Sequence, residues 1–162
     1  EDHPDCEKAH FRLGQLYLNE KKYRRAGDYF RKALSINDSY ADSHFHLGLA
    51  YGFMKKYSQA IGEFSAAVKI DPGFIDAWYN MGNIYTRLKN HEKALEAYRK
   101  IIRLEPEHLM ALYLSGDAFF ALGKYREAES MFEKALEVNF GFTAAQLALK
   151  KCREKLAASG KP

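Results

Sequence analysis

The sequence has few of the residues that characterise disulfide-stapled or membrane-spanning proteins. It holds two cysteines and four prolines, and no run approaches the roughly 20 apolar residues of a membrane helix. Cys6 and Cys152 lie near opposite ends of the 162-residue chain, so we expect two unpaired thiols and no intrachain disulfide. The composition, 47% hydrophobic and 28% charged, is that of a soluble globular domain, and we favour a cytoplasmic location.

Motifs for catalysis and metal binding are also missing. His44 and His46 are two residues apart, so on a helix they face different directions and cannot share a metal ion. There is no glycine-rich phosphate loop, no Ser/His/Asp set and no HExxH motif. We therefore expect no enzymatic activity, no cofactor and no metal.

The net charge of +4 is concentrated at one end of the chain. Residues 1–142 carry 20 Lys and Arg against 20 Asp and Glu, so the whole excess lies in residues 143–162. A protein that binds nucleic acid would instead repeat basic side chains along one face. We expect no nucleic-acid partner.

What the sequence does contain is a period of 34 residues. Four sets of positions hold it: Gly14, Gly48, Gly82 and Gly116; Tyr17, Tyr51, Tyr85 and Phe119; Ala26, Ala60, Ala94 and Ala128; and Phe30, Phe64, Tyr98 and Phe132. A period kept at several independent positions predicts an array of copies of one structural unit.

Each unit has the pattern of a helical hairpin, most clearly between Ile75 and His108. Apolar residues at steps of three and four predict two helix faces, and Pro106 ends the second helix. The first face is formed by Trp78, Met81, Tyr85 and Leu88, and the second by Ala94, Tyr98 and Ile101. A glycine within a helix costs about 1 kcal/mol relative to alanine. We interpret the glycine at every repeat as the place where the two helices approach closely.

This unit resembles the tetratricopeptide repeat. Trp78, Gly82, Tyr85, Ala94 and Pro106 match the repeat's pattern, while Met81 replaces a leucine and Tyr98 a phenylalanine. The resemblance implies an all-α, right-handed α-solenoid (superhelix) of four helix-turn-helix repeats with a capping helix. The predicted segments are a lead-in (1–6), repeats at 7–40, 41–74, 75–108 and 109–142, a capping helix (143–158) and a frayed tail (159–162).

The apolar residues of the predicted capping helix are spaced as in the first helix of a repeat. The positions of the repeated glycine and tyrosine, however, hold charged residues. Lys150 stands at the glycine position and Arg153 at the tyrosine position. We expect its outer face to be in water, as in the terminal helices of repeat arrays.

In the tetratricopeptide repeat proteins that this chain resembles, the first helix of each repeat lines a concave face that binds peptides or partner helices. We predict a groove there with an aromatic residue at the fifth position of every repeat. The candidate residues are Phe11, Gln15, Phe45, Leu49, Phe53, Tyr79, Asn80, Asn83, Arg87, Tyr113, Asp117 and Phe120. The fifth-position rings have two interpretations, groove anchors or packing between neighbouring repeats, and the sequence leaves both open.

The predicted function is a non-catalytic interaction module for an apolar or amphipathic segment of a partner protein, without membrane insertion. The lysines and asparagines with which some relatives clamp a C-terminal carboxylate are absent, since the fifth position is always aromatic. Two alternatives remain open. One is a self-assembling homo-oligomeric scaffold. The other is the substrate-recruiting arm of a larger enzyme, because Glu1 in place of a starting methionine suggests an excised piece.

Overall fold

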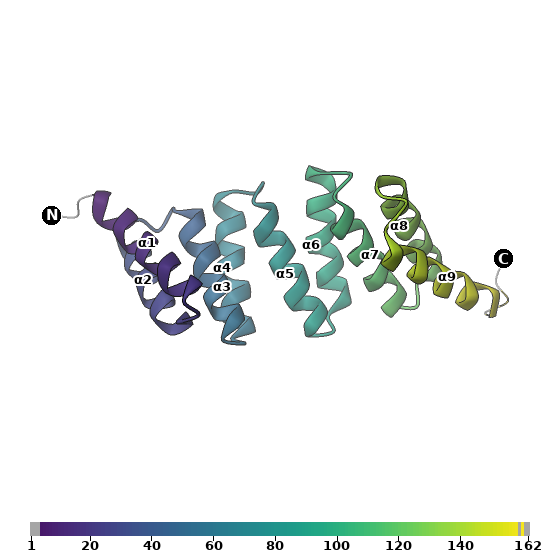
Figure 1. Cartoon of the computed structure of the whole chain (residues 1–162), viewed down its shortest axis with the longest axis horizontal. Helices are drawn as coiled ribbons and strands as arrows, with labels where there is room; N and C mark the ends of the chain where they lie inside the picture. The colour runs from purple at the N-terminus through teal and green to yellow at the C-terminus, as the bar shows by residue number, and fades with distance from the viewer. Residues whose placement is uncertain (1–3, 159, 161–162) are drawn as a thin grey trace. The chain divides into compact units, whose positions relative to one another are not determined.

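The structure is a computed structural model that describes residues 4–158 and 160. Within these residues the chain forms nine α-helices and no strand. Figure 1 labels the helices in chain order. The helices are α1 (Pro4–Asn19), α2 (Tyr23–Ile36), α3 (Ala41–Phe53), α4 (Tyr57–Ile70), α5 (Ile75–Arg87), α6 (His91–Leu104), α7 (Leu109–Ala121), α8 (Tyr125–Val138) and α9 (Thr143–Ala158). The prediction of an all-α fold built from helical hairpins is confirmed.

Two details at helix ends differ from the sequence-based expectations. The first helix begins at Pro4, so residues 4–6 belong to α1 and not to a lead-in; residues 1–3 lie outside the described part. Leu88 was placed on the apolar face of α5, and this is wrong because α5 ends at Arg87 and Leu88 is 50% exposed. Of the predicted tail, only Gly160 is described.

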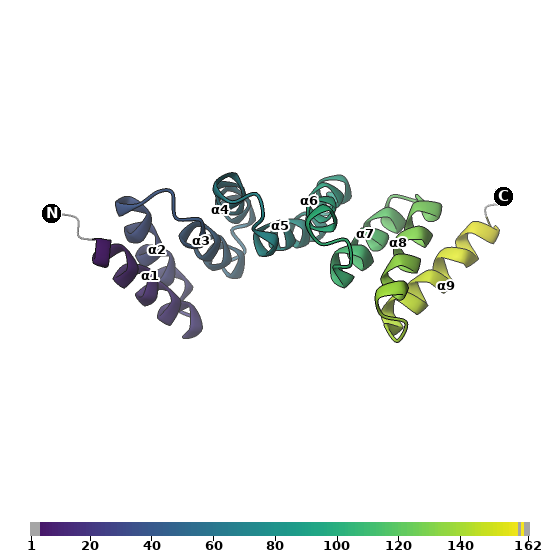
Figure 2. The ribbon, with the colours of Figure 1, turned by 90° about the horizontal axis from the view of Figure 1, so that it is seen from above.

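The chain divides into two compact units, Glu1–Met81 and Gly82–Pro162. In the first unit α1 packs against α2 and α3, and α3 also packs against α2 and α4. In the second, α7 packs against α6 and α8, and α9 lies against α8 and the adjacent part of α7. Figure 2 shows α7, α8 and α9 side by side. The core of each unit therefore forms between sequential helices.

The repeated glycines mark a close approach of the two helices within each hairpin. A Cβ atom built on Gly14 would stand 2.5 Å from Cε1 of Phe30, and one on Gly116 would stand 2.5 Å from Cε1 of Phe132. The corresponding distance is 2.7 Å from Gly48 to Phe64 and 2.5 Å from Gly82 to Tyr98. The ring of the second helix thus occupies the space that any side chain would fill. The interpretation of the glycine period as close helix contact is confirmed.

The turn between the two helices of each hairpin has one shape. Its central residue has a positive φ: Lys21 (59°), Lys55 (59°), Lys89 (57°) and Gly123 (71°). The amide of the next residue donates to a carbonyl five residues earlier, as from Lys124 to Phe119 over 3.0 Å. This is the Schellman ending of a helix, in which a left-handed residue lets the chain reverse. Three hairpins place a lysine where glycine fits best.

The last helix, α9, closes the second unit on α8. Ala145, Leu149 and Cys152 are buried, and the Cys152 Sγ–H donates to the carbonyl of Tyr125 over 2.8 Å. Burial is the main reason why the pKa of the Cys152 thiol is raised. The other cysteine, Cys6, is exposed on α1.

Arg153 contributes a second link between α9 and α8. Its Nε donates to Glu129 over 2.7 Å and its guanidinium to Glu133 over 2.8 Å. In a longer array, the second helix of the next repeat would cover the position of Arg153. In this structure Arg153 forms ion pairs with α8, and Lys150 is exposed.

Candidate peptide-binding site

The aromatic residues at the fifth position of the repeats lie on the first helices, and in the first, second and fourth repeats they pack against a ring of the same repeat. Phe11 has its ring centroid 5.2 Å from that of Tyr40, and Phe45 lies 4.8 Å from Phe74. Tyr113 is placed in the same way, 5.1 Å from Phe142. In these three repeats the partner ring stands at the end of the repeat, where the next helix begins.

These aromatic residues differ in how much surface they leave to a ligand. Phe45 is 9% exposed and belongs to the core, so it offers a ligand almost nothing. Phe11, Tyr79 and Tyr113 are half-buried. The ring of Phe45 therefore packs inside the protein and does not anchor a ligand, whereas the other three residues remain partly accessible.

The polar residues predicted to line the groove are partly engaged inside the protein. Asn83 accepts a hydrogen bond from the hydroxyl of Tyr98 over 2.9 Å. Asn80 donates to the carbonyl of Asp76 over 2.8 Å, one turn back on the same helix. Gln15 lies 3.4 Å from the ring nitrogen of His46. The sequence did not reveal these internal hydrogen bonds.

Three further predicted residues lie near or at the surface. Phe53 is 57% exposed, with its ring stacked on Tyr23 at a centroid distance of 4.8 Å. Arg87 is exposed at the end of α5, and Leu49 is half-buried on α3.

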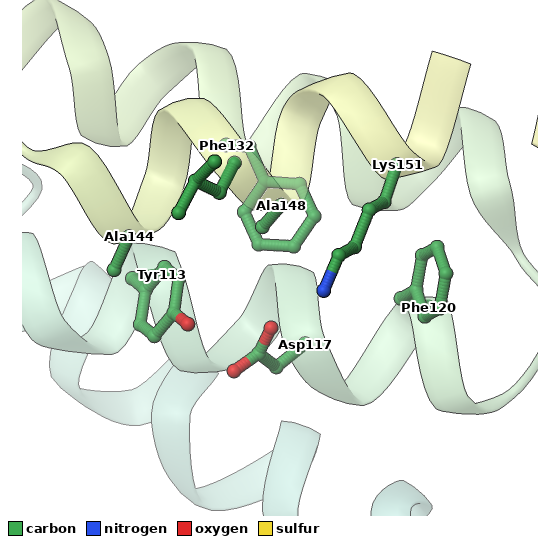
Figure 3. A pocket seen from close by; sticks show the side chains of 8 residues that line it. Tyr113, Asp117, Phe120, Phe132, Ala144, Ala148 and Lys151 are labelled. Carbon is green, nitrogen blue, oxygen red and sulfur yellow. The ribbon is translucent and has the colours of Figure 1, made fainter. Parts of the chain in front are cut away.

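The remaining predicted residues, Asp117 and Phe120, meet Tyr113 at a pocket of about 370 Å³ in the second unit, shown in Figure 3. All three project from α7. The full lining is Tyr113, Asp117, Phe120, Phe132, Ala144, Leu147, Ala148 and Lys151. The pocket thus has a wall from α7, a wall from α9 and the buried ring of Phe132 from α8 between them.

The α9 side of the pocket was missed in the sequence-based prediction. The signal was present, because α9 continues the spacing of a first helix. Leu147 stands at its fifth position and Lys151 at its ninth, the positions held by Tyr113 and Asp117 in the fourth repeat. Treating α9 only as a cap concealed that its inner face repeats the groove positions.

One half-buried carboxylate dominates the electrostatics of the pocket. Burial raises the pKa of Asp117, and the hydroxyl of Tyr113 opposes that shift only in part. The pKa of Tyr113 is raised by burial first and then by the charge of Asp117. Lys151 is exposed and extends from α9 toward the pocket. The site therefore offers apolar walls, an acceptor and a cationic donor.

Other kinds of site were sought in the same residues. Among residues 4–158 and 160, no three His, Cys, Asp or Glu side chains gather as a metal ion would require. None of the helices in this part of the chain is long and apolar enough to cross a membrane.

Comparison with known families identifies the class of protein. Tetratricopeptide repeat models match residues 7–40 and 75–108, 54–89, and 111–141, which together are most of the chain. The chain belongs to the tetratricopeptide repeat family, and its fold is the solenoid of that family. This family comprises interaction and scaffold modules that bind proteins or peptides and are generally not catalytic.

Solved structures agree with this assignment. A crystal structure of MamA shares 28% identity at a TM-score of 0.79, covering 83% of this chain and 79% of that one. A tetratricopeptide repeat protein from Parabacteroides merdae ATCC 43184 shares 25% identity at a TM-score of 0.86, covering 93% of this chain and 61% of that one. YrrB, described as having an unusual peptide-binding site, shares 22% identity at a TM-score of 0.78, covering 90% and 75%, a likeness of fold alone. A comparison with curated protein sequences gives no match.

Proposed function

We propose that the chain binds a segment of a partner protein and that the pocket between α7 and α9 holds an apolar side chain of that segment. The observation that carries the proposal is that the pocket combines apolar walls with two polar groups. Aromatic and aliphatic side chains form most of the lining, and Asp117 and Lys151 project from different helices. Concave, largely apolar pockets with a few placed polar groups are typical ligand sites.

The two polar groups fit the backbone of an extended peptide. Beside each of its side chains, a peptide carries one amide N–H and one carbonyl oxygen. Asp117 can accept from the amide, and Lys151 can donate to the carbonyl, while the neighbouring side chain enters the apolar space. The charges are of opposite sign, so we expect the affinity to depend weakly on salt.

The other predicted groove residues are proposed as supporting contacts. In the second unit, Arg87 is exposed and can contact the partner protein outside the pocket. In the first unit, the exposed Phe53 and the accessible parts of Phe11 and Tyr79 can form a separate contact surface of that unit. We propose a protein partner and no nucleic acid, because the pocket presents a single lysine and not a row of cations.

The test uses peptides selected from a random peptide library displayed on phage, with the whole chain as bait. Leu147→Ser removes one apolar wall at a side chain that is 57% exposed, so the fold should persist. We expect affinity for the selected peptides to fall about tenfold or more, as for a truncated hot-spot contact. Phe140→Ser, at a loop residue that is 82% exposed and outside the pocket, is the matched control.

Two results would contradict the proposal. One is that selection yields no peptide with saturable binding. The other is that the selected peptides bind Leu147→Ser and the unmodified chain equally well. Sedimentation over a concentration series, read with and without peptide, separates this function from self-assembly through the same surface.

A further inference from the structure

The outer face of α1 carries an apolar stripe that no helix covers in the described residues. Ala9, Leu13 and Leu16 follow one another at steps of four and three, so they share one face of the helix. Leu13 is 38% exposed and Leu16 is 51% exposed, and Ala9 is exposed as well. Large apolar side chains that gather on one exposed helix face indicate a contact surface.

The helices that correspond to α1 later in the chain bury the same three positions. This holds for every such helix that lies in one unit together with the helix before it. On α3, α7 and α9 no member of the set is more than 9% exposed. The sets are Ser43, Leu47 and Ala50; Ala111, Ser115 and Ala118; and Ala145, Leu149 and Cys152. The cover is each time the preceding second helix, which is α2 for α3, α6 for α7 and α8 for α9.

The covering helix α6 shows what such a face accepts. Leu95 belongs to the same core cluster as Ala118 and Phe119, near the end of α7. Ile102, seven residues later, packs against the cluster that contains Leu112, near the start of α7. The covering helix therefore runs antiparallel to the helix it covers, and its two aliphatic contacts are seven residues apart.

Between these contacts the covering helix carries an arginine. The Arg99 guanidinium lies 5.7 Å from the centroid of the Phe119 ring. On α2, Arg31 occupies the same place and donates to the hydroxyl of Tyr51 over 3.2 Å. Phe119 and Tyr51 are the 34-residue equivalents of Tyr17 on α1. A helix that covered α1 would meet the same kind of ring.

We propose that the face of α1 formed by Ala9, Leu13 and Leu16 docks an amphipathic helix of a partner protein. This partner helix carries aliphatic residues seven positions apart with an arginine four positions after the first, and it runs antiparallel to α1. Its N-terminus then lies near Glu20, the first residue after α1, which also forms an ion pair with Lys22 over 2.7 Å. A carboxylate there interacts favourably with the positive end of a helix dipole. In the other repeats this position is apolar, as at Met54 and Leu122.

The probe is a synthetic peptide with the sequence of α6, His91–Leu104, in which a hydrocarbon staple replaces the exposed residues Glu96 and Lys100. The staple holds the helix, because an isolated helix of this length is marginal in water. Fluorescence anisotropy of the labelled peptide against the whole chain should show saturable binding. Leu13→Glu with Leu16→Glu should weaken it at least tenfold, and Arg99→Gln in the peptide should weaken it several-fold.

The control variant is Leu104→Glu on α6, which changes a leucine that is 47% exposed to the same residue in the other unit, outside the pocket, and should bind the stapled peptide normally. Circular dichroism should show equal helical content for all variants, since the substituted side chains are exposed. The proposal is overturned if the unmodified chain does not bind the peptide or if the Leu13/Leu16 variant binds it equally well. It is also overturned if the unmodified chain sediments as a dimer that the same variant dissociates, because a second copy would then be the occupant.

Discussion

The hydroxyl of Tyr98 donates a hydrogen bond to Oδ1 of Asn83 over 2.9 Å, and Oγ1 of Thr86 lies 3.2 Å from the same hydroxyl. Tyr98 is fully buried at the position where the other three repeats have phenylalanine. Burying a hydroxyl without a partner is unfavourable, and the third repeat supplies two partners from its own first helix. Asn83 thus serves the hairpin interior, although the sequence suggested a ligand contact.

The first prediction is that Tyr98→Phe destabilises the protein modestly. It removes hydrogen bonds worth about 1 kcal/mol and leaves Asn83 and Thr86 with one partner fewer. Urea denaturation followed by circular dichroism measures the change in the free energy of unfolding. A variant as stable as the unmodified protein would mean that these hydrogen bonds contribute nothing.

The second prediction is the converse change in the second repeat. Phe64→Tyr places a hydroxyl beside Leu49 and Gly52, which offer no side-chain partner, and should cost about 1–3 kcal/mol. Adding Leu49→Asn and Gly52→Thr should restore part of the loss. A Cβ at Gly52 would meet no atom within 4 Å, so the threonine has room. If Phe64→Tyr is destabilised and the two added substitutions do not restore stability, the loss is caused by the position of the ring and not by the lack of hydrogen-bond partners.

The third prediction concerns the close helix contact at Gly116. Gly116→Ala should lower the free energy of unfolding by about 1–3 kcal/mol, because the added Cβ would stand 2.5 Å from the Phe132 ring. The matched control is Gly62→Ala on α4, where nothing lies within 4 Å. That variant should gain about 0.5–1 kcal/mol from helix propensity alone. Thermal unfolding of both variants should therefore shift in opposite directions.

The fourth prediction uses the left-handed turn residues. Lys55→Gly should stabilise the protein by about 0.5–1 kcal/mol, since glycine adopts a positive φ without the clash that a side chain suffers. Gly123→Lys makes the reverse change at the equivalent turn and should lose a similar amount. Each variant keeps the hairpin length, so denaturation midpoints can be compared directly. Equal midpoints for all three proteins would mean that the turn geometry relaxes.

The fifth prediction concerns pH. The folded protein binds the Asp117 proton more tightly than the unfolded chain, since burial raises the pKa of this carboxyl above its ordinary value of 3.8. The stability that this group contributes is therefore complete below about pH 4 and is lost as the pH rises through the folded pKa. Asp117→Asn removes that loss. The variant should gain on the unmodified protein at neutral pH, and the gain should shrink on acidification.

Urea denaturation at several pH values measures this difference between the two proteins. Asp42→Asn, at an exposed site on α3, makes the same change of charge and serves as the control. A pH profile of Asp117→Asn parallel to that of the unmodified protein would show that Asp117 does not carry the effect.

The contacts that recur in every repeat could be predicted well, because the residues that form each of them occur four times in the sequence. The period of Gly82 and Tyr98, held in every repeat, identified two helix faces that meet and how closely they approach. Contacts that occur once lack this support. The bond from Tyr98 to Asn83 depends on which way a single hydroxyl points, and the pocket depends on how α9 lies against α7. Neither follows from spacing alone, although Leu147 and Lys151 at groove positions were a usable signal.

The contrast between the two cysteines gives the protein a selective labelling site. The Cys152 thiol is buried and bonded to a carbonyl, and its raised pKa disfavours the thiolate that reacts with maleimides. Cys6 is exposed one turn before Ala9, on the helix proposed to dock a partner. A fluorophore added to the unmodified chain should therefore attach at Cys6 and report on events at α1, so the reagent needed to test that surface requires no substitution.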